Sequence, residues 1–474
     1  MKRLCTILIA VVVLSSGIAW AQGSTTVDAT AAPDSAFWRV LTLRDYNTRV
    51  VVLGVTMLGI AAGTIGGFML LRKRALLGDA LAHATLPGIA IAFMVMVAAG
   101  GTGKWLPGLL MGAVISGLAG VGMILLIQGL TRLKEDTALG IVLSMFFGLG
   151  VALMGIVQRM SAGSAAGLET FIYGKTAAML ASDAKLIACT AVVVSVICLL
   201  LFKELRLLSF DPAFARAQGW PTLGLDLLMM AMVTGVTVVG LQAVGLILII
   251  ALLIIPAAAA RFWTHRLRTM LLLSAVLGGV SGWIGASISA LVPRMPAGAI
   301  IVLVAAAGFV VSMFAGPARG VLARWIRLQQ LNRLVARQHL LRAAYELIET
   351  GHAPTGPSGR PRIRIADLMA MRSWSRWSLM RLIHRLDRQE LITLLPGEVI
   401  ELTDAGMIEA RRVVRDHRLW ELYLITHAEV APSHVDRGAD MIEHVLGNEM
   451  VAKLERLLEQ ERQEQIPQTP HVIR

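Results

Sequence analysis

The stretch VVVLGVTMLGIAAGTIGGFMLLRKR, residues 50–74, decides the fold class, because 22 residues without a charged side chain run directly into three basic ones. A helix needs about 20 apolar residues to cross the hydrocarbon core of a bilayer. Similar apolar runs recur along the chain, whose 474 residues are 56% hydrophobic. The sequence therefore predicts an all-α polytopic membrane protein.

We expect about nine transmembrane helices, and a count of basic residues in their connections orients them. The expected spans are 49–71, 81–100, 106–130, 137–158, 184–203, 225–241, 242–260, 270–292 and 297–316. With the N-terminus outside, the cytoplasmic connections hold fourteen Lys and Arg against five in the opposite connections. Basic residues concentrate on the cytoplasmic side of membrane proteins. We therefore expect a multi-pass protein of the inner (plasma) membrane with its C-terminal tail in the cytoplasm.

The first residues read as a targeting segment. Lys2 and Arg3 precede a short apolar run, and Ala19-Trp20-Ala21 is a small-x-small pattern. This order predicts a signal peptide over residues 1–21, and an uncleaved first anchor is the alternative.

The segment GDALAHATLPG, residues 78–88, places an ionisable pair beside a span. Asp79 and His83 are four residues apart, so on a helix they lie on one face. Such a pair is costly in lipid and indicates a functional site, although a helix cap with a satisfied histidine is the plainer reading. A carboxylate and an imidazole suit Mn²⁺, Fe²⁺ or Zn²⁺, and a second copy of the chain would raise two ligands to four.

Four ordered motifs resemble the membrane permeases of manganese, zinc and iron ABC importers. They are RKRALLGDALAHATLPGIAIAF, TRLKEDTALGIVLS, LLSFDPAFARAQGWP and LQAVGLILIIALLIIPAAAARFWTHRL. The resemblance implies a permease domain over residues 40–316, with Asp79 and His83 in the metal pathway. It also implies a periplasmic metal-binding protein, a homodimer or a paired permease, and no tightly bound cofactor.

The third motif predicts a contact with another subunit. Residues 210–219 form a short amphipathic helix with Pro at its start, and an ordinary interfacial helix is the alternative. The resemblance makes it the coupling helix that docks the ATPase, through Phe210, Asp211, Pro212, Phe214, Arg216 and Gly219. No GxxxxGK[ST] occurs in the chain, so we expect a transporter subunit rather than an enzyme, with ATP hydrolysis on a separate subunit.

Two further segments break the apolar pattern. Pro87-Gly88 invites a helix break or kink, and Pro256 interrupts LIIPAAAAR, where a packing kink and a pathway element are both open.

The tail after residue 316 predicts a winged helix-turn-helix domain over residues 325–400. Its segment 364–406 reads as helix, turn, helix, two short strands around Pro396-Gly397, and a further helix. Residues 360–388 hold eight arginines against two aspartates. Arg376, Arg381 and Arg385 could therefore meet the phosphates of nucleic acid or anionic lipid headgroups.

The stretch RRVVRDHRLWELYLITHAEVAPSHVDRGADMIEHVLGNEM, residues 411–450, resembles the metal-sensing and dimerisation region of diphtheria-toxin-repressor-type regulators. Together with the winged helix the resemblance spans about residues 331–460, and it implies a helical metal-sensing and dimerisation domain over residues 401–462. The matching positions are His417, Glu421, Asp440, Glu443 and His444, which could hold a regulatory divalent metal. His339 and Arg342 stand where the family usually has acidic or thioether ligands, and Arg342 cannot bind a cation. A metal-binding tail and a tail kept for dimer packing both stay open at this point.

The sequence as a whole favours an importer of Mn²⁺, Zn²⁺ or Fe²⁺ with a fused regulator-like domain. A membrane-anchored, metal-dependent transcription regulator is the alternative. Because the tail balances 23 basic against 20 acidic residues, we expect only modest attraction to DNA and favour a feedback sensor over a repressor.

Overall fold

The computed structural model describes residues 45–428, apart from 73, 75, 102, 104, 161–175, 177–178, 293–294 and 358. The expected signal peptide, residues 1–21, lies outside these residues. The chain divides into two compact units, residues 1–324 and 325–474. Each unit is described by itself.

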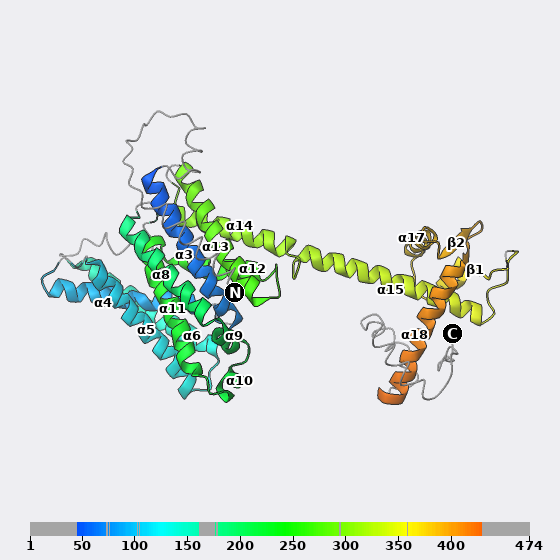
Figure 1. The fold of residues 1–474 in the computed structure, drawn as a ribbon, viewed down its shortest axis with the longest axis horizontal. Helices are drawn as coiled ribbons and strands as arrows, with labels where there is room; N and C mark the ends of the chain where they lie inside the picture. Colours follow the sequence, from blue (N-terminus) through cyan, green and yellow to red (C-terminus); the bar gives the residue numbers. More distant parts are fainter. Residues whose placement is uncertain are drawn as a thin grey trace, which may run out of the picture. The chain divides into compact units, whose positions relative to one another are not determined.

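The first unit is entirely helical over its described residues (Figure 1). Its helices are α3 (Tyr46–Leu71), α4 (Leu77–Ala98), α5 (Leu106–Leu130), α6 (Glu135–Arg159), α8 (Ala181–Leu200), α9 (Phe202–Phe210), α10 (Pro212–Ala217), α11 (Thr222–Val244), α12 (Leu246–Ala260), α13 (Leu267–Leu291) and α14 (Ala297–Ala315). Eight of them are long and apolar enough to cross a membrane: α3, α4, α5, α6, α8, α11, α13 and α14.

The expected span 242–260 is shorter than the sequence indicated. Helix α12 has 15 residues, which at about 1.5 Å per residue cannot cross a core about 30 Å thick. The chain breaks at Gly245, whose φ of 86° ends α11 and starts α12. Helix α12 continues through Pro256 to Ala260, so this proline does not end the helix, and the packing kink and the pathway element stay predictions.

Close contacts between backbones hold the helices together. Helix α3 is buried over most of its length and packs against α13, α8 and α12. Helix α4 crosses α5 where Gly88 faces Gly112, and a Cβ added to Gly112 would stand 2.4 Å from the Gly88 carbonyl oxygen. Glycine is therefore required at this crossing for the two backbones to approach.

Replacing Gly112 with alanine is expected to destabilise the helical unit by about 1–3 kcal/mol, because the added methyl overpacks the α4–α5 crossing. Gly122→Ala in the same helix is the matched control, since nothing lies within 4 Å of an added Cβ there. Thermal unfolding of the purified chains should show a lower midpoint for Gly112→Ala alone. Equal midpoints would contradict this packing.

The second unit contains the expected winged helix. Helix α15 (Val321–Glu349) leads to β1 (Arg362–Arg364), α16 (Ile365–Met371), α17 (Arg376–Asp387), β2 (Ile392–Leu395), β3 (Val399–Leu402) and α18 (Asp404–Ala428). The antiparallel sheet has the order β1-β3-β2, and β1 is a strand that the sequence pattern did not indicate. The expected turn forms at Pro396-Gly397, where Gly397 has a φ of 88°.

Candidate functional site

The first candidate site is the acid–imidazole pair in the first turns of α4. The Nε2 atom of His83 lies 3.3 Å from Oδ1 of Asp79, so the predicted i, i+4 pair is formed. The two side chains are 17% and 30% exposed, which leaves them partly accessible within an apolar helix. The edge of the His83 ring also packs against Phe147 of α6, with 4.7 Å between ring centroids. The sequence pattern gave no signal for this aromatic contact.

The ring of His83 has one nitrogen without a partner. Its Nδ1 atom is buried and makes no hydrogen bond to any described residue. A neutral imidazole carries one proton and one lone pair, so one of its two nitrogens can accept a cation. Buried polar atoms are rarely left unpaired, and such an atom calls for an explanation. An imidazole lone pair beside a carboxylate can accept a transition-metal ion.

Pro87 lies one turn after His83 in the same helix. Helix α4 runs through Pro87 from Leu77 to Ala98, so of the expected break or kink the break does not occur. Proline has no backbone N–H, however, and the helical partner of that missing donor is the carbonyl of His83. The Ser116 hydroxyl of α5 donates to the nearby Ala84 carbonyl at 2.6 Å and ties this part of α4 to its neighbour.

One chain alone offers too few ligands for a closed metal site. Within the described parts of the chain, no group of three or more His, Cys, Asp and Glu side chains is placed to hold a metal ion. Two protein ligands bind an ion weakly, which suits passage better than storage. Four ligands would require a second copy of α4.

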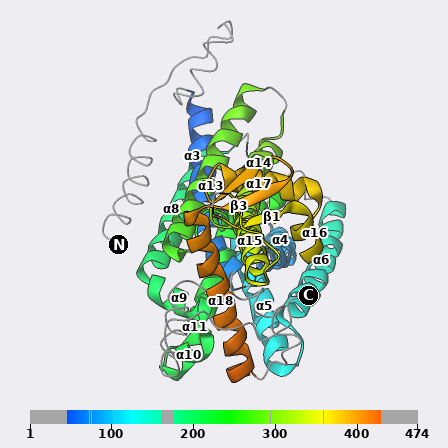
Figure 2. The ribbon, with the colours of Figure 1, turned by 90° about the vertical axis from the view of Figure 1, so that its right-hand side faces the viewer.

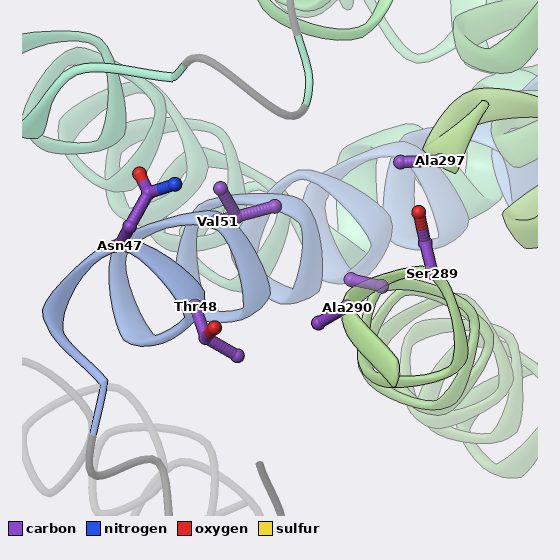
Figure 3. A pocket seen from close by; sticks show the side chains of 7 residues that line it. Asn47, Thr48, Val51, Ser289, Ala290 and Ala297 are labelled. Carbon is purple, nitrogen blue, oxygen red and sulfur yellow. The ribbon is translucent and has the colours of Figure 1, made fainter. Parts of the chain in front are cut away.

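A cavity of about 220 Å³ lies elsewhere in the helical unit (Figure 3). It is lined by the first turns of α3, the end of α13 and the start of α14, through Asn47, Thr48, Val51, Ala286, Ser289, Ala290 and Ala297. Its polar groups are an amide and two hydroxyls, with neither a carboxylate nor an imidazole. This cavity does not have the donors of a transition-metal site.

The predicted coupling helix, α10, lies with α9 at one end of the helical unit in both views (Figure 1, Figure 2). Asp211 caps it, because its carboxylate accepts the backbone N–H of Phe214 at 2.9 Å, and Pro212 is its first residue. Phe210 and Phe214 are 65% and 50% exposed, and Arg216 is exposed as well. Gly219 follows the helix with a φ of 80°. Two exposed phenylalanines with an arginine are typical of a protein contact.

A buried ion cluster connects this end of the unit to the start of α4. Arg74 precedes α4 and lies 2.7 Å from Asp226 of α11, and Arg72 lies 3.0 Å from the same carboxylate. Arg72 also donates to the Leu208 carbonyl of α9, at 3.0 Å. Burial lowers the pKa of the Arg74 guanidinium, and the carboxylate of Asp226 opposes this shift. The sequence pattern gave no signal for this cluster, because Asp226 is 154 residues from Arg72 and 152 residues from Arg74.

Asp226→Asn is expected to lower the free energy of unfolding by about 3–5 kcal/mol, since it leaves two arginines without their shared buried counter-charge. Asp136→Asn is the matched control, because Asp136 is exposed. Chemical or thermal unfolding in detergent measures the difference. If both variants unfold at the same midpoint, the cluster contributes nothing to stability.

In the second unit, the structure describes two of the five predicted ligands of the tail. His417 and Glu421 lie together on α18, with Nε2 of His417 3.2 Å from Oε1 of Glu421. Arg342 of α15 reaches the other side of the same ring. Asp440, Glu443 and His444 lie outside the described residues.

The three arginines expected to meet phosphates all lie exposed on α17. Arg376 pairs with Glu398 of the β2–β3 turn, and the guanidinium of Arg381 stacks on Trp377, 3.2 Å from the ring centroid. The exposed positions of Arg376, Arg381 and Arg385 are compatible with either anionic partner.

Comparison with known proteins reports on both units. Residues 403–468 match the iron dependent repressor, metal binding and dimerisation domain. The zinc transport system membrane protein TroC of Treponema pallidum is 43% identical over 290 residues, 61% of this chain and 96% of that protein. A chain of PsaBC from Streptococcus pneumoniae, solved in complex with Fab, superposes with a TM-score of 0.53 at 32% identity, covering 62% of this chain and 99% of that one.

One further match reaches past the helical unit. The manganese transport system membrane protein MntC of Bacillus subtilis is 37% identical over 399 residues, which are 84% of this chain and 88% of that protein. Residues 44–316, more than half of the chain, match the ABC 3 transport family. The helices around Asp79 and His83 are therefore those of a multi-pass membrane protein, and this chain is a member of the ABC 3 transport family.

Proposed function

We propose that this chain is the membrane permease subunit of an ABC importer for a divalent transition metal, Mn²⁺, Zn²⁺ or Fe²⁺. The observation that carries the proposal is the pair on α4, in which the carboxylate of Asp79 lies 3.3 Å from Nε2 of His83 while Nδ1 of the same ring makes no hydrogen bond to a described residue. The relatives named for manganese and zinc transport support the same cargo.

Transport then proceeds by transient coordination. A periplasmic metal-binding protein delivers the ion to the outer side of the inner membrane. Asp79 and His83 of two permease copies, either a homodimer or a matched pair, exchange with the water ligands of the ion as it passes. Two ligands per chain bind the ion weakly enough to release it, whereas a closed set of protein ligands would retain it.

ATP hydrolysis drives this cycle from a separate subunit. We place the ATPase on α10, where Phe210, Phe214 and Arg216 are exposed. The Arg72–Asp226 cluster joins the adjacent α9 to the segment before α4, so movement of the docked end is passed to the start of the metal-bearing helix. The excess of basic residues in the predicted cytoplasmic connections assigns the tail to the cytoplasm in this proposal.

The element content of cells that lack this chain tests the proposed cargo. Deletion is expected to lower one of manganese, zinc or iron in medium where that metal is scarce, and re-expression of the intact chain restores it. Unchanged content of all three elements under scarcity would contradict the proposal.

A membrane-anchored transcription regulator is the second candidate, favoured only by the exposed arginines of α17. Metal-stimulated ATP hydrolysis by the chain with its candidate ATPase supports the importer. Sequence-specific DNA binding by a chain that stimulates no ATPase supports the regulator.

A further inference from the structure

A cluster of four buried polar side chains joins α15 to α18 in the second unit. Arg342 and Glu346 come from α15, and His417 and Glu421 come from α18. Their exposed fractions are 3%, 8%, 1% and 0%. The cluster includes the two described residues of the predicted metal-sensing set.

The guanidinium of Arg342 lies at the centre of this cluster. Its Nε atom donates to Oε1 of Glu346 at 2.6 Å, and its Nη1 atom lies 3.0 Å from Nδ1 of His417. On the far side of the ring, Nε2 of His417 lies 3.2 Å from Oε1 of Glu421. The contacts thus run from carboxylate to guanidinium to imidazole to carboxylate.

This order determines the protonation of His417. A guanidinium only donates hydrogen bonds, so Nδ1 of His417 must accept. The proton of the neutral ring is then on Nε2, where it faces the carboxylate of Glu421. Both ring nitrogens are engaged, and neither presents a lone pair to a metal ion. His83 differs in this respect, because its Nδ1 has no partner among the described residues.

The charge of the cluster also disfavours a metal ion at His417. Arg342 stays protonated at any physiological pH, and it stands where the resemblance to metal-sensing regulators implies an acidic or thioether ligand. Its positive charge is neutralised by Glu346, one turn further along α15. A divalent ion at His417 would meet a fixed positive charge within hydrogen-bond distance. The surroundings of His417 and Glu421, the two described residues of the expected site, therefore do not fit a metal ion.

We propose that the guanidinium of Arg342 is a resident cation that replaces the divalent metal of this domain. It holds α15 against α18 through His417, as a bound ion would, but it cannot dissociate. The tail then packs its helices whether or not metal is present, and His417 and Glu421 do not report the cytoplasmic metal level. The expected feedback sensor is replaced by a constitutively assembled module. This inference does not depend on the proposed transport function.

Metal content of the full-length chain tests the proposal. All chains carry Asp79→Asn and His83→Ala, so that the pair on α4 contributes no metal. After equilibrium dialysis against Mn²⁺ or Co²⁺, elemental analysis compares this background with the same chain carrying His417→Ala. We expect no difference in bound metal between the two. One equivalent lost on His417→Ala would show that His417 is a ligand and would overturn the proposal.

A second pair of variants tests the role of the arginine itself. Arg342→Glu in the same background removes the resident cation and adds a carboxylate beside His417. We expect one equivalent of Co²⁺ to be gained, with visible absorption bands that disappear when His417→Ala is added. A folded Arg342→Glu chain that gains no metal would overturn the role of the guanidinium.

Arg342→Glu removes the cation that pairs with buried Glu346 and adds a second carboxylate beside it, so this variant can fail to fold without metal. Arg342→Met, which offers a thioether instead of a charge, is therefore measured in parallel. If size-exclusion chromatography shows that neither substituted chain is folded, the comparison with and without His417→Ala decides the proposal alone.

Discussion

His83→Ala is expected to abolish metal uptake while leaving the chain in the membrane. The substitution removes the imidazole lone pair and the contact with Asp79, so the ion loses one of the two ligands that each chain offers. Loss of groups that only support metal ligands costs about 10–100-fold in affinity or activity, so loss of a direct ligand should cost at least as much. Asp79→Asn keeps the shape of the side chain and should fail for the same reason.

Uptake of radiolabelled Mn²⁺ or Zn²⁺ by cells expressing each variant measures the effect. Ile91→Ala in the same helix is the matched control, because Ile91 is 47% exposed and lies about two helical turns beyond His83. It should transport at the parental rate. Parental uptake by both His83→Ala and Asp79→Asn would place the pathway elsewhere.

Changing Phe214 and Arg216 together to alanine is expected to remove metal-dependent ATP hydrolysis. Both side chains are exposed on α10 and contribute nothing to the core, whereas Ala215 between them is buried. The docked ATPase would lose an aromatic anchor and an arginine, the residue types that carry the most binding energy at protein interfaces. Stability of the helical unit should stay unchanged.

ATPase stimulation in reconstituted vesicles measures this second effect. Leu223→Ala is the control, since Leu223 is 64% exposed at the start of α11 but lies outside the proposed coupling segment. Equal stimulation for the double variant and the control would move the docking surface away from α10.

The helices and the acid–imidazole pair could be predicted from the sequence because both depend on local patterns. Apolar length indicates a span, and four-residue spacing brings Asp79 and His83 to one face of α4. The winged helix was predictable for the same reason, since Pro396-Gly397 gives the turn between β2 and β3.

The unpredicted features depend on contacts between distant residues. Periodicity could not show that Asp226 neutralises Arg72 and Arg74, or that Phe147 packs on His83. The break at Gly245 was also missed. In the sequence, a proline inside an apolar run is a stronger sign of a helix break than a glycine. A helix can nevertheless continue through Pro256 when neighbouring helices support it. The positive φ of Gly245 ends α11 instead.

Only part of the arrangement around Arg342 could be predicted from the sequence, because the rest depends on contacts between helices. Its spacing from Glu346 indicates an i, i+4 ion pair, and its mismatch with a metal ligand was visible in the sequence. That its guanidinium reaches Nδ1 of His417 depends on how α15 and α18 pack. The difference between an unpaired imidazole nitrogen at His83 and an occupied one at His417 separates the two candidate metal sites.

ATP-driven accumulation of metal in vesicles tests the importer most directly. The chain is reconstituted with its ATPase and its binding protein. Transport of Mn²⁺, Zn²⁺ and Fe²⁺ is then measured from the side of the vesicle membrane that holds the binding protein to the opposite side. We predict ATP-dependent accumulation of at least one of these ions, and none with His83→Ala. A complete, ATP-hydrolysing complex that accumulates none of the three ions, or that accumulates one equally well with His83→Ala, would contradict the account.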